Sequence, residues 1–350
     1  MKFLPQAAVV GTVIAAAAGA HAQSTVTLYG VVDTGIEYMS HANARGQDNV
    51  YRVSSGNTAG SRWGLRGKED LGSGMSAIFA LESGFATDTG TSVQGGRLFG
   101  RQAWVGLNSA WGRITLGRQV NTLYDLFPAF EPTRYTTYGL LAQDAQFTNR
   151  VDNAVKIWRD IGPVAVTALY STGYDSTIAN GSEVPGNLRV GQEMSVGARY
   201  NGNALSMAAA YDQRRGTTVA SAGSLERRYT TAVSYDFASA GVVAGYRYLQ
   251  SDLTAPQYRA NLYWLGGYYK FHPRLVLRGG AYWNDRRQSG NDTLSYVLAL
   301  QYGLSRRTMA YANATYVNNR GTATTGAAVG TRVAAGANQT GVVIGIKHIF

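Results

Sequence analysis

Residues 340–350, TGVVIGIKHIF, are the stretch that decides the fold. Alternate positions of this segment form one face that ends on an aromatic ring: Val342, Ile344, Ile346, His348 and Phe350. A soluble protein seldom ends on an exposed Phe, because chain termini usually fray into water. A strand can end in this way when its last ring lies at a membrane interface and the strand pairs back to the first strand of a barrel. The rest of the chain must then supply the other strands.

The N-terminus has the three parts of a secretory signal peptide. Lys2 supplies the positive start, residues 7–18 form an apolar run, and Ala20-His21-Ala22 is a small-x-small cleavage site. The apolar run is too short to span a bilayer, which needs about 20 apolar residues. We therefore predict that residues 1–22 are a cleaved signal peptide and that residues 23–350 form one exported domain. No later stretch is apolar enough for a transmembrane helix.

The composition restricts the chemistry of the chain. The absence of Cys excludes disulfides and thiolate metal sites. The 43 Gly and 23 Tyr with only 7 Pro suit many strands, because Pro cannot donate to a strand ladder. A net charge of +11 often indicates nucleic-acid binding. Here the arginines are spread through nearly every strand instead of forming one patch, so no nucleic-acid partner is expected.

Alternating runs recur along the chain and predict its strands. A transmembrane strand needs about 9–11 residues with apolar side chains outside and polar ones inside, as in residues 193–200, 228–237 and 294–303. Seven short turns rich in Gly, Pro, Asn or Ser separate such runs: 71–74, 109–112, 160–163, 201–204, 238–241, 272–274 and 303–306. Seven short turns between eight hairpins predict sixteen strands. Longer polar loops are expected on the other side: 41–59, 173–191, 214–226 and 321–338.

Short turns on one rim and long loops on the other are typical of an outer-membrane barrel. A soluble sandwich or propeller also alternates, but its strands average about five or six residues, and a β-solenoid would show a fixed short repeat. We predict an all-β fold, a 16-stranded antiparallel transmembrane β-barrel with short periplasmic turns and long extracellular loops. Arg or Lys facing lipid at mid-membrane costs roughly 2–4 kcal/mol. Most mid-strand arginines must therefore face a water-filled interior.

Three motifs carry a resemblance to a known family: SRWGLRGKEDLGSGM (61–75), GRLFGRQAWVGL (96–107) and GRITLGRQ (112–119). With the LYGVVD start at residue 28 and the GIKHIF end, they resemble the general porins of Gram-negative bacteria, especially the basic beta-proteobacterial type. The resemblance covers the whole mature chain in the family's order. It implies a 16-stranded barrel that assembles as a homotrimer, with the third long loop folded into the pore.

Residues 120–149 fit that pore-constricting loop. Several apolar side chains could pack it against the inner wall, which a solvated loop would not need: Leu123, Leu126, Phe127, Phe130, Leu140 and Leu141. A loop of this length is usually functional or disordered, and its apolar content favours a function.

The family's constriction places arginines on one wall against acids of the inward loop. By motif, the wall arginines correspond to Arg62, Arg101 and Arg150, with Arg118 flanking them, and the acidic candidates are Asp125, Glu131 and Asp144. The loop departs from the family pattern around residues 128–138, where Arg134 is basic. Alternatively, each interior arginine pairs with a neighbouring acid and only holds the wall rigid. Four arginine pairs at strand ends indicate contact with lipid headgroups or lipopolysaccharide: Arg214-Arg215, Arg227-Arg228, Arg286-Arg287 and Arg306-Arg307.

The resemblance implies passive diffusion of small hydrophilic solutes and ions across the outer membrane. Arg and Lys rings favour anions, and the 32 basic residues, one of them Lys2, exceed the 21 acids, which predicts weak anion selectivity. A channel selective for phosphate, sugars or peptides and a non-conducting barrel adhesin remain open alternatives. No enzyme, metal site or cofactor is expected, because the four His lack metal spacing and no catalytic or phosphate-binding motif occurs.

Overall fold

The computed structural model describes residues 24–350 except residue 44, residues 175–182 and residue 255. The predicted signal peptide, residues 1–22, lies outside the described residues. No helix in the described ranges is long and apolar enough to cross a membrane. In the same ranges, seventeen strands form a single antiparallel sheet: β1 Thr25–Met39, β2 Val50–Ser55, β3 Arg62–Gly72, β4 Met75–Gly84, β5 Gln102–Ser109, β6 Gly112–Val120, β7 Arg150–Ile161, β8 Val164–Ser171, β9 Glu193–Asn201, β10 Leu205–Arg215, β11 Leu225–Asp236, β12 Ala240–Ser251, β13 Tyr258–His272, β14 Leu275–Arg286, β15 Thr293–Gly303, β16 Thr308–Asn319 and β17 Gln339–Ile349.

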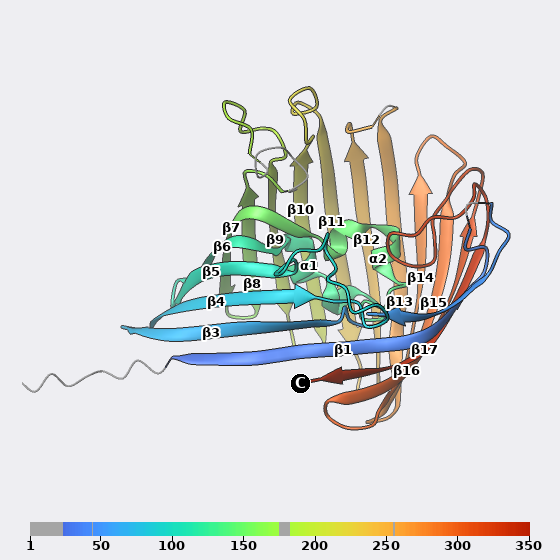
Figure 1. Cartoon of the computed structure of the whole chain (residues 1–350), viewed down its shortest axis with the longest axis horizontal. Helices are drawn as coiled ribbons and strands as arrows, with labels where there is room; N and C mark the ends of the chain where they lie inside the picture. The colour runs from blue at the N-terminus through green and yellow to red at the C-terminus, as the bar shows by residue number, and fades with distance from the viewer. Residues whose placement is uncertain (1–23, 44, 175–182, 255) are drawn as a thin grey trace, which may run out of the picture.

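The sheet closes because the last strand pairs with the first. The register of β1 and β17 runs from Val31 opposite Ile349 to Met39 opposite Gly341. Beyond the ladder, the Phe350 amide donates to the Gly30 carbonyl at 3.1 Å. Figure 1 shows β17 beside β1 with the C-terminus at that seam. Closure removes the two exposed edges that an open sheet would present to lipid.

The seventeen segments make sixteen barrel strands, because β2 and β3 are two halves of one interrupted strand. Both pair with β1, β2 along its second half and β3 along its first half. In the interruption between them, the Asp33 carboxylate accepts hydrogen bonds from the Thr58 amide at 2.8 Å, the Thr58 hydroxyl at 2.6 Å and the Ala59 amide at 2.8 Å. The 16-stranded antiparallel barrel is therefore confirmed.

Two predicted loop boundaries were wrong. Residues 50–55 were assigned to a long loop at 41–59, but they form β2, because Val53 and its alternate neighbours continue the outer face of the barrel. The loop expected at 214–226 is also shorter, since β10 extends to Arg215 and β11 begins at Leu225. All seven short turns are confirmed between the strands that they were expected to join.

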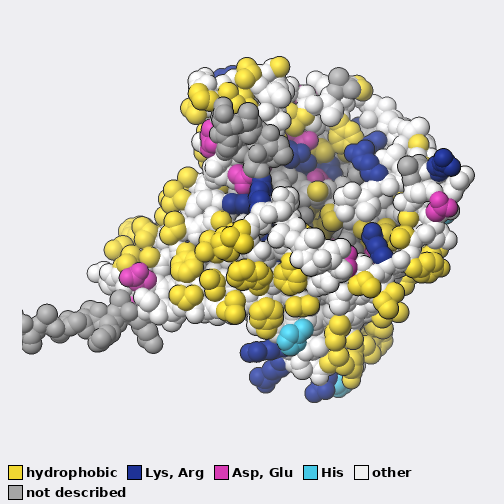
Figure 2. Space-filling model, viewed as in Figure 1, with side chains coloured by type: hydrophobic (Ala, Val, Ile, Leu, Met, Phe, Trp, Pro, Cys, Tyr) yellow, Lys and Arg dark blue, Asp and Glu magenta, His cyan; other side chains and the backbone are white. Residues whose placement is uncertain are grey.

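The two faces of the sheet differ as the alternation predicts. On β1 the side chain of Ile36 is 72% exposed on the outside, whereas its neighbour Glu37 is 1% exposed on the inside. On β17 the corresponding pair is Ile344, 63% exposed, and Val343, which is fully buried. Figure 2 shows hydrophobic side chains over the outer wall and Lys and Arg side chains in the hollow that it encloses. The outer apolar band is the surface that contacts lipid.

The third long loop lies inside the barrel, between β6 and β7. It contains α1 Thr122–Leu126, the 3₁₀ helix η1 Pro128–Phe130, α2 Leu140–Gln143 and the 3₁₀ helix η2 Ala145–Thr148, and Figure 1 shows α1 and α2 within the ring of strands. The carbonyl oxygen of the Asn121 side chain caps α1 by accepting from the Tyr124 amide at 2.9 Å. The inward folding of the loop is therefore confirmed.

The loop is held by an apolar core that it shares with the inner wall. All six apolar loop residues named from the sequence are buried in this core, together with wall residues of β10 to β17 such as Leu262, Trp264 and Val297. The Trp264 indole donates to the Phe130 carbonyl at 2.8 Å. A Cβ on Gly280 would come within 2.9 Å of the Pro132 ring, so glycine in the wall makes room for the loop.

Candidate pore constriction

Four arginines on neighbouring strands form the basic side of the candidate constriction. We call them the arginine cluster: Arg62, Arg101, Arg118 and Arg150. Arg62 opens β3 and Arg150 opens β7, whereas Arg101 precedes β5 and Arg118 lies in β6. Adjacent strands bring them together, since Arg118 is opposite Ala103 and Arg150 is opposite Val120. Residues separated by 88 positions in the sequence thus share one patch of wall.

Glu82 on β4 holds two members of the cluster. Its Oε1 accepts from Arg101 Nε at 2.7 Å, and its Oε2 lies 3.4 Å from Arg62 Nε. The Tyr29 hydroxyl donates to the same Oε2 at 3.0 Å. Charge-assisted hydrogen bonds of this kind fix the orientation of guanidinium groups. Sequence reasoning missed Glu82, although a carboxylate within the apolar run of β4 indicates an inward-facing position.

Asp152 on β7 holds the third member. Arg118 Nη1 forms an ion pair with Asp152 Oδ1, and Arg118 Nε donates to the Gly100 carbonyl at 2.7 Å. Arg97, in the loop between β4 and β5, reaches the other oxygen of Asp152 at 3.3 Å. The loop between β4 and β5 is therefore attached to the wall beside the arginine cluster.

Arg150 is the least neutralised member of the arginine cluster. Its Nη1 donates to the Thr148 carbonyl at 2.7 Å, and its guanidinium lies 5.2 Å from the centre of the Tyr124 ring. In the described part of the chain, no carboxylate lies within ion-pair distance of Arg150, and its Nε is buried without a hydrogen-bond partner.

Tyr124 on α1 is the loop side chain that faces the cluster. Burial acts to raise the pKa of the Tyr124 phenol, but the positive charges of Arg150, Arg101 and Arg62 outweigh it and lower that pKa. A Tyr side chain suits a position beside arginines, because its oxygen can accept hydrogen bonds from guanidinium groups and its ring can stack on them. Sequence reasoning named no aromatic residue of the loop for this place.

The three acids named from the sequence turn away from the arginine cluster, toward other partners. Asp125 Oδ2 lies 2.6 Å from Lys156 Nζ of β7. Burial raises the pKa of Asp125, and the nearby charge of Lys156 only partly opposes this effect. The Asp125 side chain is 17% exposed, compared with 7% for Asp144, and Glu131 is almost fully buried. Asp125 is therefore the most exposed of the three acids.

Glu131 is buried within the loop itself. Its Oε2 accepts from the Tyr135 amide at 2.7 Å and from the Thr133 hydroxyl at 3.0 Å, and its Oε1 accepts from the Tyr282 hydroxyl of β14. A carboxylate with this many donors is satisfied without an arginine. Glu131 therefore links the loop to the wall through the Tyr282 hydroxyl.

Asp144 lies against the opposite wall of the barrel. Its Oδ2 is 2.9 Å from Arg228 Nε on β11 and 3.2 Å from Arg247 Nε on β12. Burial acts to raise the pKa of Asp144, but the two arginines outweigh it and hold that pKa well below its usual range. The structure therefore brings the four arginines together and separates the three acids from them.

The expectation that Arg227-Arg228 and Arg214-Arg215 contact lipid headgroups was wrong for one residue of each pair. Arg228 is buried inside the barrel against Asp144, and Arg214 Nε lies 2.6 Å from Glu226 Oε1. Successive side chains of a strand point to opposite faces, so only one arginine of a pair can face outward. The period of two is the signal that locates Arg228.

No group of three or more His, Asp or Glu side chains that could hold a metal ion occurs in the described residues. The contacts that hold Arg62, Arg101 and Arg118 are ion pairs and hydrogen bonds. A basic wall with partly shared carboxylates favours small anions.

Comparison with known proteins gives consistent matches. A family model described as Gram-negative porin matches residues 7–322. An outer membrane porin protein of Bordetella pertussis is 32% identical over 95% of this chain and 96% of its own length. Outer membrane porin protein 32 of Delftia acidovorans is 30% identical over 97% of each chain. The solved anion-selective porin from Comamonas acidovorans superposes with a TM-score of 0.80 at 25% identity, over 94% of this chain and 100% of that structure.

Proposed function

Because the chain belongs to the family of Gram-negative porins and is a passive β-barrel channel of the outer membrane, we propose that the arginine cluster makes it weakly anion-selective. One observation carries this proposal: Arg62 and Arg101 share the single carboxylate of Glu82, and Arg150 contacts a carbonyl and a Tyr ring, with no ion pair to an acid in the described residues. The excess positive charge lies on the wall that faces the inward loop, and rings of Arg and Lys favour anions. The anion selectivity of the similar Comamonas porin supports it.

The acidic side of the constriction takes a different form in this proposal. Asp125, Glu131 and Asp144 are the negative groups of the loop at 120–149, and they act through Lys156, Tyr282 and Arg228, their respective partners on the wall. Their charges are used to seat the loop, so they oppose the arginine cluster only weakly across the water. The electric field between the arginines and the loop acids is therefore weak, and we expect only a weak preference for anions.

The remaining parts of the proposal follow from the family. Residues 1–22 direct export and are removed, and residues 23–350 form the channel, which assembles as a homotrimer. Small hydrophilic solutes and anions pass without consuming energy and without catalysis. Exposed arginines of the rim, such as Arg287, contact lipopolysaccharide phosphates.

Planar-bilayer recordings of the refolded protein under a salt gradient test this function. Stepwise openings that close in thirds, with a reversal potential on the anion side, would support a trimeric anion-selective pore. A cation-side reversal potential would contradict the role of the arginine cluster. A silent membrane, despite verified insertion, would favour a non-conducting adhesin.

A further inference from the structure

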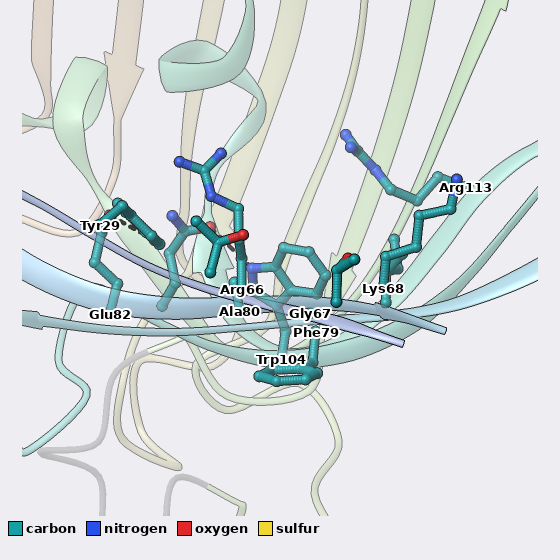
Figure 3. Close-up of a pocket in the computed structure, with 13 residues that line it drawn as sticks. Tyr29, Arg66, Gly67, Lys68, Phe79, Ala80, Glu82, Trp104 and Arg113 are labelled. Atoms are coloured by element: carbon teal, nitrogen blue, oxygen red, sulfur yellow. Dashed lines mark hydrogen bonds between the residues drawn. The ribbon is translucent and has the colours of Figure 1, made fainter. Parts of the chain in front are cut away.

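A second set of cations lines the lumen away from the arginine cluster, toward the short turns. They lie around a recess of about 530 Å³ in the inner wall, between β1 and β6. We call it the vestibule recess and define it by six of its side chains: Tyr29, Arg66, Lys68, Gln102, Trp104 and Arg113. Figure 3 shows Arg66 and Arg113 extending on the same side of the sheet. The volume is in the range of small-molecule sites, about 300–1,000 Å³.

Two cations of the vestibule recess, Arg66 and Arg113, lie beside aromatic rings. In the described residues, none of Arg66, Lys68 and Arg113 forms an ion pair with a carboxylate. Arg66 instead stacks on Tyr29, with its guanidinium carbon 4.2 Å from the ring centre, and Arg113 lies 5.8 Å from the centre of a Trp ring on β7. Glu82 also borders the recess, but it is engaged by the arginine cluster. The recess therefore has a local excess of positive charge.

Two aromatic rings of the recess are held in place. The Tyr29 hydroxyl is fixed by Glu82 at 3.0 Å, and its ring lies over Gly64, where an added Cβ would come within 2.9 Å of the ring. The Trp104 indole donates to Gln102 Oε1 at 2.9 Å and remains half-exposed to the lumen. Rings positioned by hydrogen bonds lose little conformational entropy when a ligand stacks on them.

We propose that the vestibule recess binds small anions that carry a flat ring, namely aromatic carboxylates. The ring would stack on Trp104, and the carboxylate would accept from Arg113 and Lys68, neither of which forms an ion pair within the described residues. This inference deepens the proposed function, since it rests on entry of anions into the lumen and names a class that the lumen retains. Aliphatic anions of equal charge lose the stacking contribution.

Current block by benzoate and by cyclohexanecarboxylate tests the proposal. The two anions have equal charge and similar size, but only benzoate is flat. Added to the side of the short turns, benzoate should reduce single-channel current at about three- to tenfold lower concentration than cyclohexanecarboxylate, as expected for one aromatic contact. Equal block by both anions would overturn the proposal. So would stronger block by glucose 6-phosphate, which would assign the recess to sugar phosphates.

Matched variants separate the ring from the charges. Trp104→Leu should remove the preference for benzoate, whereas Trp104→Phe should keep it. Lys68→Gln with Arg113→Gln should weaken block by both anions, and Arg306→Gln, at an exposed short turn, should leave both unchanged. Retention of the full preference in Trp104→Leu would contradict the assignment. A channel with an anion-side reversal potential but no preference for benzoate would refute only this inference, whereas a cation-side reversal potential would refute the proposed function.

Discussion

Asp144 Oδ2 lies 2.9 Å from Arg228 Nε, and this ion pair joins the end of the inward loop to the wall opposite the arginine cluster. Both side chains are almost fully buried, and Arg247 adds a second contact at 3.2 Å. The pair therefore attaches the end of the loop to β11. This contact lies on the far side of the barrel from the candidate selectivity residues.

Removing that anchor should loosen the loop. Asp144→Asn removes the acid that pairs with Arg247 and one of three acids around Arg228, which keeps Glu226 at 2.7 Å and Asp212 at 3.6 Å. Leaving a buried charge without its partner typically costs about 3–5 kcal/mol, and this cost falls on Arg247. We expect noisier single-channel currents and a lower denaturant midpoint, measured in bilayers and by equilibrium unfolding. Glu69→Gln, which removes the same charge from an exposed site, is the control. Equal current noise in the two variants would mean that Asp144 does not hold the loop.

Anion selectivity should increase as the pH falls, because of Asp125. Burial raises the pKa of Asp125, so it takes up a proton above the usual range of an aspartate, near 3.9. Protonation removes its negative charge and leaves Lys156 without its partner, 2.6 Å away. Reversal potentials measured from neutral pH down to about pH 4 should shift to the anion side in the wild type. In Asp125→Asn the potential should start on the anion side of wild type, and this part of the pH shift should be absent. An unaltered pH shift in Asp125→Asn would contradict the assignment.

The glycine under the loop should control conductance. A side chain at Gly280 would collide with Pro132, whose ring carbons lie 2.9–3.0 Å from a Cβ there. Gly280→Val should push the loop toward the lumen and lower single-channel conductance. At the adjacent Gly279, an added Cβ would lie 3.1 Å from Leu298 Cδ2 instead of meeting Pro132, so Gly279→Val serves as the matched control. Unchanged conductance in Gly280→Val would show that the loop does not rest on this wall.

Local patterns predicted much of the fold, because they act within one strand or one turn. The alternation of residues 340–350 indicated the seam between β17 and β1, and the apolar residues of the third loop indicated its packing. Residues 50–55 were assigned to a loop from the sequence, although they form β2. The interruption between β2 and β3 depends on hydrogen bonds to Asp33, which lies on another strand and is not indicated by the local pattern.

The partners of the loop acids could not be predicted in the same way. Asp144 and Arg228 are 84 positions apart, and only closure of the barrel and the path of the loop bring them together. The motif resemblance named Arg62, Arg101, Arg118 and Arg150 as wall residues. They lie together in the structure because the strands from β3 to β7 pair in sequence order. The loop departs from the family pattern around residues 128–138, so the resemblance gave three candidate acids, Asp125, Glu131 and Asp144, but not their partners on the wall.

The reversal potential of a triple variant tests the central claim most directly. Arg62→Gln, Arg101→Gln and Arg150→Gln together remove three charges from the arginine cluster. Arg274→Gln, Arg306→Gln and Arg307→Gln together remove three charges from exposed positions near the short turns. Under the same salt gradient, the first variant should move the reversal potential toward the cation side, and the second should leave it near the wild-type value. An unchanged potential in the first variant, with conductance intact, would contradict the claim that the arginine cluster sets the selectivity.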